Sequence, residues 1–315
     1  MQQNMRYVYE IYRQKSFSKA AEALFMTQPA LSIAIAKLEA DIGMPLFDRS
    51  TRPISLTPAG RIYLDAIEQE RYLEQDLYQR LNDIRQLNTG EVTIGSSHYI
   101  NAYILPPVLT GFQQQFPNIQ FHLSEGSSYL MAKQLKHREI DITFSCDDTI
   151  IKAFDSWPLF ADTILLAVPQ SFPVNRQYRE QALTAEDIAA CRHLTSDCPE
   201  VPLAGFYREP LIVLHEGNNL RQRVMDFFHQ AGIEPIVKLE LSQMATAYHL
   251  AEAGFAATFL SDHLITGLHS SLCFYRLAGM DSRRTFHVLT NPQRYLSQAV
   301  QQLIQYMRDT FTSTT

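Results

Sequence analysis

The 315-residue sequence contains no run of 18 apolar residues, so a transmembrane helix is not expected. Its first 17 residues, MQQNMRYVYEIYRQKSF, lack the basic head and apolar core of a secretory signal, which predicts a cytoplasmic protein. Motifs typical of zinc proteases, serine hydrolases and Walker-A nucleotide-binding proteins are also missing. The sequence therefore gives no reason to expect an enzyme, a cofactor or a membrane partner.

Cysteine is scarce as well, with four residues in the whole chain: Cys146, Cys191, Cys198 and Cys273. In a cytoplasmic protein, so few cysteines predict reduced thiols rather than a disulfide framework. Cys191, Cys198 and His193 lie close together in a predicted loop, an arrangement that metal-binding or redox-sensing sites use. No fourth ligand is near and no C-x-x-C motif occurs, so ordinary loop residues are favoured and no metal site is expected.

Charge is divided unevenly along the chain, whose net charge is −6. Residues 1–60 carry seven Lys and Arg against five Asp and Glu, whereas the remaining residues carry 20 against 28. A mildly basic N-terminal segment on an acidic body is consistent with one end that faces phosphate groups. A surplus of two charges is by itself a weak indication of DNA binding.

Residues 16–42 have the pattern of two helices joined by a tight turn. Ser16 or Ser18 can cap the first helix, and Thr27 can cap the second, with Pro29 in its first turn. One side of the second helix is apolar at helical spacing, through Leu31, Ile35, Leu38 and Ile42. This pattern is typical of a helix-turn-helix, whose second helix enters the DNA major groove, although a plain αα-hairpin also fits it.

Four short motifs follow one another in this region: SFSKAAEAL, TQPALSIAIAKLE, LFDR and LTPAG. In these motifs the sequence resembles the N-terminal domain of LysR-type transcriptional regulators. The resemblance implies a winged helix-turn-helix in residues 1–58, a linker helix in 59–88 that forms a homodimer, and an effector-binding domain in 89–315. Double-stranded promoter DNA and a small-molecule effector are the implied partners, with RNA polymerase as a further candidate and a homotetramer as the larger assembly.

The second helix and the wing after it contain the residues that we expect to contact DNA. Gln28 and Ser32 are candidates for base contacts, because Gln can read adenine through two hydrogen bonds. Pro29 and Ile33 can contact thymine methyl groups. The two wing arginines are candidates for phosphate or minor-groove contacts, although solvated loop charges are the alternative. The full set of expected DNA-binding residues is Ser18, Thr27, Gln28, Pro29, Ser32, Ile33, Lys37, Arg49 and Arg52.

A long helix that Thr57 can cap is predicted to run to about Leu87. Such a length calls for a helical partner. The same helix of a second subunit is the simplest one, and packing against its own domain is the alternative. Asn88, Thr89 and Gly90 then end the helix and are predicted to serve as a hinge. The helix carries an apolar stripe at steps of three and four, through Leu73, Leu77, Leu81, Ile84 and Leu87.

Predicted strands and helices alternate from residue 91 onwards, an order that indicates parallel sheets with right-handed crossovers. The first set consists of strands 91–97, 118–126 and 140–146 and helices 102–116 and 129–139. The second set consists of strands 163–169, 210–216, 237–241, 256–261, 273–278 and 285–290 and helices 184–190, 219–232, 244–253 and 293–311.

The expected fold is α+β and multidomain, with a winged helix-turn-helix, a linker helix and a two-lobed α/β domain that looks like a periplasmic binding protein. The first lobe is expected in about 91–161 and 267–315, and the second in 162–266. A ligand would bind between the lobes, at the carboxyl ends of strands. A solute-binding protein or an enzyme could use the same α/β half, but the DNA-reading segment argues against both.

Small polar residues stand at the predicted helix N-termini of this α/β half. Because free N–H groups and the helix dipole favour negative charge there, we expect an anionic effector such as a carboxylate. Simple helix capping is the alternative for each residue. By family position, the resemblance implies these effector-binding residues: Ser97, His98, Tyr99, Ile100, Gly126, Ser127, Ser128, Cys146, His215, Asn218, Ser242 and Gln243.

Overall fold

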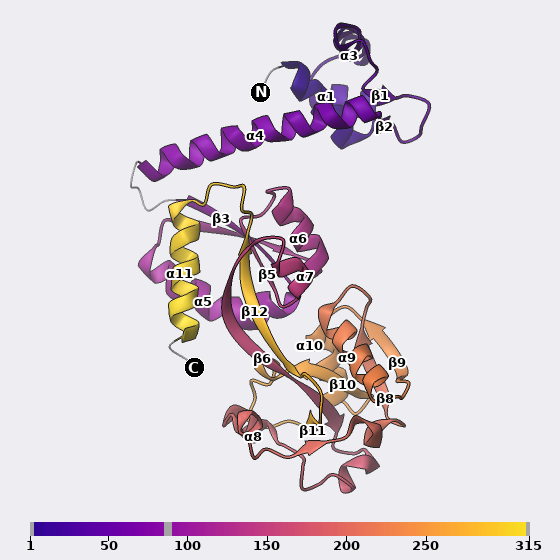
Figure 1. Ribbon diagram of the computed structural model, residues 1–315, viewed down its shortest axis with the longest axis vertical. Coiled ribbons are helices and arrows are strands. Elements are labelled where there is room, and N and C mark those ends of the chain that lie inside the picture. The colour runs from indigo at the N-terminus through magenta and orange to yellow at the C-terminus, as the bar shows by residue number, and fades with distance from the viewer. Residues whose placement is uncertain (1–2, 85–89, 313–315) are drawn as a thin grey trace. The chain divides into compact units, whose positions relative to one another are not determined.

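The computed structural model describes residues 3–84 and 90–312 (Figure 1). The chain divides into two compact units, Met1–Arg85 and Gln86–Thr315, called here the N-terminal and C-terminal units. The expected end of the linker helix at Leu87 and the hinge residues Asn88 and Thr89 lie outside the described residues. None of the described helices is both long and apolar enough to cross a membrane.

Three helices form the core of the N-terminal unit, and the second and third are the predicted pair. The Ser16 hydroxyl accepts a hydrogen bond from the Lys19 N–H and caps the second helix, and Thr27 caps the third in the same way. Gly43 ends the third helix in the left-handed conformation that glycine adopts without strain. The helices are α1 (Gln3–Gln14), α2 (Phe17–Ala23) and α3 (Gln28–Ile42).

The predicted stripe of α3 faces this core. Leu31 and Ile35 are fully buried there, together with Val8 and Ile11 of α1. The wing that follows α3 consists of two short antiparallel strands, β1 (Phe47–Asp48) and β2 (Ser55–Leu56). The unit is therefore a winged helix-turn-helix.

The linker helix α4 (Pro58–Ile84) begins where predicted. The Thr57 hydroxyl donates a hydrogen bond to the Pro45 carbonyl and accepts one from the Gly60 N–H, which joins the helix start to the wing. Leu64 and Ile67 pack onto the unit, whereas four members of the stripe beyond them are exposed: Leu73, Leu77, Leu81 and Ile84.

In the C-terminal unit, β3 pairs with β4 and β5 in parallel, as predicted. The predicted helix 102–116 is divided into a π-helical turn (Ile100–Ile104) and α5. Pro106 and Pro107 lack the N–H groups that a continuous α-helix needs, so the regular helix starts at Leu105. The first set comprises β3 (Gly90–Ser96), α5 (Leu105–Gln115), β4 (Ile119–Glu125), α6 (Ser128–Lys136), β5 (Ile142–Ser145) and α7 (Asp148–Ile151).

A long strand, β6 (Asp155–Pro169), joins the two halves of the C-terminal unit and begins eight residues before the predicted start. Its first part, up to Thr163, pairs with β12 (Arg283–Thr290). Its second part, from Ile164, pairs with β10 on one side and β11 on the other. Figure 1 shows β6 running between the two halves.

The second half contains a parallel sheet of β8, β9 and β10 with helices between the strands. Strand β11 also belongs here, because it pairs with the second part of β6 and with β7. The expected lobe limits differ on this point, since they leave β11 in the first lobe. The elements are β7 (Glu200–Val201), α8 (Ala185–Ala189), β8 (Pro210–Leu214), α9 (Asn219–Gln230), β9 (Ile236–Leu241), α10 (Met244–Glu252), β10 (Ala257–Ser261) and β11 (Leu272–Leu277).

The last helix, α11 (Gln298–Thr312), returns to the first half and buries one face in its core. It begins five residues later than predicted, because Asn291 and Ser297 hold the preceding segment in turns. Short 3-10 turns complete the unit at η2 (Pro173–Arg176), η3 (Arg192–Leu194), η4 (Leu203–Phe206) and η5 (Asp262–Leu264).

Candidate nucleic-acid interface and ligand cavity

The outer face of α3 contains the predicted base-reading residues. Gln28 and Pro29 are exposed at its N-terminus, and Ile33 is 71% exposed one turn further along. The Gln28 side-chain amide donates a hydrogen bond of 2.9 Å to the Ser32 hydroxyl, so these two polar groups hold each other in place. Lys37 is exposed at the next turn. The face is thus open, with a polar pair beside an apolar patch.

The two wing arginines differ in their surroundings. Arg49 donates a hydrogen bond of 3.2 Å to Glu39, and its guanidinium lies 4.9 Å from the centre of the Phe17 ring. Glu39 also accepts hydrogen bonds from the backbone N–H groups of Leu46 and Phe47. Arg49 is therefore fixed beside α3, whereas Arg52 is exposed in the loop between the wing strands.

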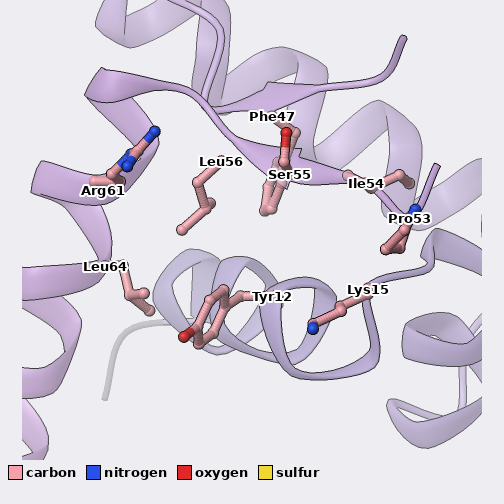
Figure 2. Close-up of a pocket in the computed structure, with 9 residues that line it drawn as sticks. All are labelled: Tyr12, Lys15, Phe47, Pro53, Ile54, Ser55, Leu56, Arg61 and Leu64. Carbon is pink, nitrogen blue, oxygen red and sulfur yellow. The ribbon is translucent and has the colours of Figure 1, made fainter. Parts of the chain in front are cut away.

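The N-terminal unit also has an open, mainly apolar hollow of about 440 Å³. Figure 2 shows that it lies between α1, the wing and α4. Two cations, Lys15 and Arg61, stand among its apolar side chains. None of the predicted DNA-binding residues lines this hollow, and sequence reasoning did not anticipate it.

A second cavity, of about 330 Å³, lies between the two halves of the C-terminal unit. Eleven of the twelve expected effector-binding residues line it. The exception is Ile100, which is buried in the core of the first half, because the π-helical turn directs it there rather than into the cavity. The eleven are Ser97, His98, Tyr99, Gly126, Ser127, Ser128, Cys146, His215, Asn218, Ser242 and Gln243.

Three helices begin at this cavity. The side chains of Ser127 and Asn218 cap α6 and α9 by accepting hydrogen bonds from backbone N–H groups. At the start of α10, Gln243 makes no such side-chain bond. Because the first N–H groups of a helix have no partner within it, the cavity wall presents backbone donors and the positive ends of three helix dipoles.

Sequence reasoning missed the contribution of β12 to the cavity. Arg284 and Phe286 line it, although both are almost fully buried. The sequence of β12 does not predict that the Arg284 side chain points inward, because its partner, Asp162, is 122 residues away in the sequence. Further lining residues that were not anticipated are Glu125, Leu214, Glu216, Gly217, Asn219, Leu220 and Met244.

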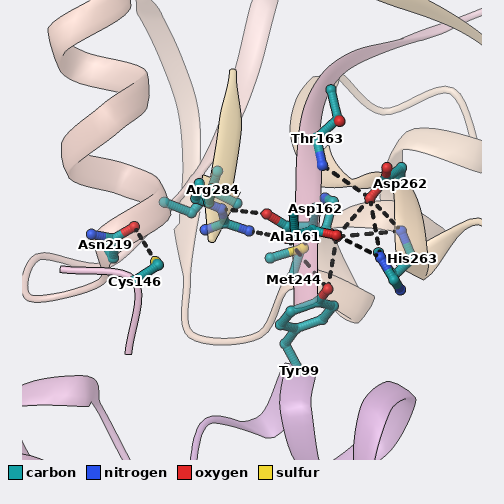
Figure 3. Close-up of polar contacts among 12 residues, drawn as sticks. Tyr99, Cys146, Ala161, Asp162, Thr163, Asn219, Met244, Asp262, His263 and Arg284 are labelled. Carbon is teal, nitrogen blue, oxygen red and sulfur yellow. Dashed lines mark hydrogen bonds and ion pairs between the residues drawn. The ribbon is translucent and has the colours of Figure 1, made fainter. Parts of the chain in front are cut away.

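Arg284 and Asp162 form a buried ion pair behind the cavity (Figure 3). The Arg284 Nε donates to one Asp162 oxygen at 2.8 Å, and a second guanidinium nitrogen donates to the other. Burial alone would lower the pKa of Arg284, but the charge and hydrogen bonds of Asp162, together with the nearby Cys146 and Tyr99, outweigh burial and hold that pKa above its usual value. The guanidinium therefore stays charged inside the protein.

Tyr99 extends this network toward the second half. Its hydroxyl is 2.8 Å from the Ser261 hydroxyl and donates to Asp162 at 3.3 Å. Burial, aided by the negative Asp162, raises the pKa of Tyr99 well above its usual value, so the phenol remains protonated. Cys146 makes a second link, because its thiol donates to the Asn219 side-chain oxygen at 3.1 Å. Both links join residues of the two halves.

Asp262 stands beside the crossing of β6. Its carboxylate accepts a hydrogen bond from the Thr163 N–H and lies 2.9 Å from the His193 Nε2. Burial acts to raise the pKa of Asp262, but the hydrogen bonds from His193 and Thr163 and the charges of His193 and His263 together outweigh burial and hold the pKa below its usual value. His193 is thus engaged with a carboxylate rather than with Cys191 or a metal.

Cys191 and Cys198, which are close in the sequence, differ in their exposure to solvent. Cys191 is exposed, whereas Cys198 is buried in the core. Within residues 3–84 and 90–312, no cluster of three or more His, Cys, Asp or Glu side chains is suited to hold a metal ion.

Comparison with known proteins identifies the family of both units. Residues 2–61 match the family described as "Bacterial regulatory helix-turn-helix protein, lysR family". Residues 85–201 and 188–312 match the "LysR substrate binding domain". A HTH-type transcriptional regulator of Bacillus subtilis (strain 168), YcgK, is 27% identical over 98% of this chain and 94% of its own length.

A probable RuBisCO transcriptional regulator of Thalassiosira pseudonana is also 27% identical, over 94% of this chain and 93% of its own. Among solved structures, full-length CbnR complexed with its target DNA has the same fold, with a TM-score of 0.63 at 19% identity over 98% of this chain and 99% of its own. Taken with the winged helix-turn-helix and the two-lobed α/β unit, these matches show that the chain belongs to the LysR family of DNA-binding transcriptional regulators with an effector-binding domain.

Proposed function

We propose that this regulator binds a small anionic effector in the cavity between the two halves of its C-terminal unit. The observation that carries the proposal is the meeting of three helix N-termini, those of α6, α9 and α10, at one cavity. Such termini attract carboxylates and phosphates through their free N–H groups and dipoles. A volume of about 330 Å³ matches a small metabolite.

Positive charge lies deep in the cavity, and negative charge lies at its exposed edge. Arg284 lies deep in the wall, where Asp162 balances its charge, and the helix N-termini supply further positive potential. Glu125 and Glu216 are exposed lining residues that face water. An effector with its acidic group placed deep and a neutral or cationic group outward fits this division best.

A thermal-shift screen with small mono- and dicarboxylates tests this assignment. A ligand that binds the folded protein raises its stability according to its concentration and affinity. Ser97→Trp fills the cavity and should abolish the shift, whereas Ser171→Trp, at an exposed serine outside the cavity, should leave it unchanged. An equal shift in both variants would place the binding site elsewhere.

On DNA, we propose that Gln28 and Ser32 read bases, while Pro29 and Ile33 contact thymine methyl groups. Their exposure on the outer face of α3 supports this assignment. The sugar-phosphate backbone of the DNA would be contacted by Ser18, Thr27, Lys37, Arg49 and Arg52.

A gel shift with the protein's own promoter region should show salt-sensitive binding. Gln28→Ala should lower specific affinity more than affinity for random duplex, and equal losses would contradict base reading.

We also propose a homodimer formed through α4. Leu73, Leu77, Leu81 and Ile84 follow one another at helical spacing and are between 45% and 76% exposed. Covering this stripe removes apolar surface from water, which favours association. Sedimentation of the full chain should give a dimer or tetramer, and Leu77→Lys with Leu81→Lys should shift it toward monomer. A monomeric parent protein would refute the assignment.

The proposed output is a change in transcription at the bound promoter. Effector binding would favour one arrangement of the two halves, by no more than its difference in affinity for the two states. RNA polymerase, acting on the same cytoplasmic DNA, is the proposed recipient of this signal.

A further inference from the structure

Arg284 uses only part of its hydrogen-bonding capacity on Asp162. Its Nε and Nη2 groups donate to the two oxygens of that carboxylate (Figure 3). The third nitrogen, Nη1, has no hydrogen-bond partner within residues 3–84 and 90–312. It belongs to a side chain that is 3% exposed and that lines the cavity between the two halves. Because a buried donor without a partner costs free energy, Nη1 points to an acceptor on a ligand.

Two carboxylates line the outer part of the same cavity, one from each half. Glu125 ends β4 and Glu216 follows β8, and both are exposed. In the part of the chain that the structure describes, neither side chain makes a hydrogen bond or an ion pair. Arg284 is the only lysine or arginine among the described lining residues, and Asp162 balances its charge. No lysine or arginine of the cavity wall therefore neutralises the two glutamates.

Helix capping does not account for these glutamates. Each is followed by a glycine and then by the residue that caps a helix, which is Ser127 for α6 and Asn218 for α9. The caps accept the N–H groups of Leu130 and Leu220 themselves. The usual task of a polar residue at a helix start is thus already done, and the carboxylates are left for another partner.

The charges of the cavity distinguish between classes of acidic ligand. A dicarboxylate would bring its second negative group beside Glu125 and Glu216, where like charges repel. A protonated amine in that place would instead donate charge-assisted hydrogen bonds to both. An α-amino acid carries its two charged groups on one carbon, whereas Arg284 is buried and the glutamates are exposed. A chain between the carboxylate and the amine fits this separation better.

We propose that the effector is a short ω-amino acid. Its carboxylate accepts hydrogen bonds from the Arg284 Nη1, and its ammonium group lies between Glu125 and Glu216. Because the two glutamates belong to different halves, the ammonium group also links the halves across the opening of the cavity. This inference rests on the proposed function, since it takes the cavity as the effector site, and it adds the chemical class of the effector.

Isothermal titration calorimetry of the full chain tests the class with matched ligands. The ω-amino acids are γ-aminobutyrate, δ-aminovalerate and ε-aminocaproate. Each is compared with the acid that lacks the amine and with its α-amino isomer. At least one ω-amino acid should bind with a Kd at least tenfold lower than both of its matched partners, as expected for hydrogen bonds between charged groups.

The double variant Glu125→Gln with Glu216→Gln separates charge from shape. It should weaken binding of the preferred ω-amino acid at least tenfold and strengthen binding of the matched acid without the amine, because repulsion at the opening is removed. A merely structural role of the glutamates would change both affinities in the same direction. Glu139→Gln with Glu234→Gln replaces one exposed glutamate outside the cavity in each half and should leave both affinities unchanged.

The outcomes distinguish this inference from the proposed function. Equal binding of an ω-amino acid and its matched acid, or tighter binding of the α-amino isomer, would overturn the inference and leave the cavity assignment intact. Binding of other carboxylates, but of no ω-amino acid, would do the same. If no carboxylate of this panel or of the wider thermal-shift screen bound, the proposed function itself would be refuted along with the inference.

Discussion

Arg284 brings a permanent charge to the cavity wall, and Asp162 makes that charge tolerable. Both side chains are almost inaccessible to water, at 3% and 0% exposure. A charge so placed must be paired, because an isolated ion inside a protein loses its hydration without compensation. The pair also fixes one surface of Tyr99, whose hydroxyl reaches toward Asp162 and Ser261.

Removing Arg284 alone should therefore be costly. Arg284→Met leaves the Asp162 carboxylate buried without its partner, and we expect the free energy of unfolding to fall by about 3–5 kcal/mol. Urea unfolding at pH 7 measures the loss. Adding Asp162→Asn to Arg284→Met removes the unpaired charge and should restore part of the stability. A double variant no more stable than the single one would show that lost packing, rather than charge, is the cause.

The charge of Asp262 should make the stability of the folded protein depend on pH. Burial acts to raise the pKa of Asp262 in the folded protein, but the hydrogen bonds from His193 and Thr163 and the charges of His193 and His263 together outweigh burial, so the pKa lies below its usual value. A lowered folded pKa means that the carboxylate stabilises the fold at pH values above about 3.9, the unfolded value. That contribution is lost as the pH falls through the lowered pKa.

Asp262→Asn should therefore destabilise the protein at pH 7 and have progressively less effect below about pH 4. Chemical unfolding of both proteins across this range measures the difference in free energy of unfolding. A difference that stays constant with pH would show that the charge of Asp262 contributes nothing.

At the scale of elements, the packing at the start of α4 explains why the LTPAG motif ends in a glycine, Gly60. A Cβ on Gly60 would lie 2.0 Å from the Leu46 carbonyl oxygen, which is backbone and cannot rotate away. The same carbonyl accepts a hydrogen bond from the Thr57 N–H. Helix and wing are thus packed at a distance that only glycine permits.

Gly60→Ala should shift α4 away from the wing and lower the free energy of unfolding by about 1–3 kcal/mol, the usual cost of overpacking. Gly267→Ala is a suitable control, because the nearest atom to its added Cβ would be the His269 carbonyl oxygen, 3.5 Å away, and its backbone is not left-handed. Thermal unfolding compares the two. Equal effects would show that close packing at Gly60 is unimportant.

The elements that the sequence predicted well are those with local signals. The caps at Ser16, Thr27 and Thr57 depend on neighbours within a few residues, and the structure confirms the helices they limit. The cavity residues at helix N-termini were placed by the family resemblance rather than by a local signal. What was missed depends on distant partners. The extension of β6 requires β12, and the inward turn of Arg284 requires Asp162.

At the scale of the whole molecule, affinity for DNA depends on how many cations meet phosphates at once. In the proposed dimer, each protomer would bring an exposed Arg52 in its wing, beside an Arg49 that Glu39 already holds. Because each neutralised phosphate releases counterions, the logarithm of the binding constant falls with the logarithm of salt concentration by about 0.9 for each such contact. The slope thus counts contacts made by the complete assembly.

Arg52→Gln should reduce the magnitude of this slope by about 1.8 if two protomers place their wings on DNA, and by about 0.9 if one does. Gel shifts or fluorescence anisotropy over a range of salt concentrations give the slope. Arg179→Gln removes an exposed cation from the C-terminal unit and should leave the slope unchanged. An unchanged slope in the Arg52→Gln protein would remove Arg52 from the interface. A loss of about 0.9 would contradict the proposed dimer on DNA, because a symmetric pair must lose both contacts together.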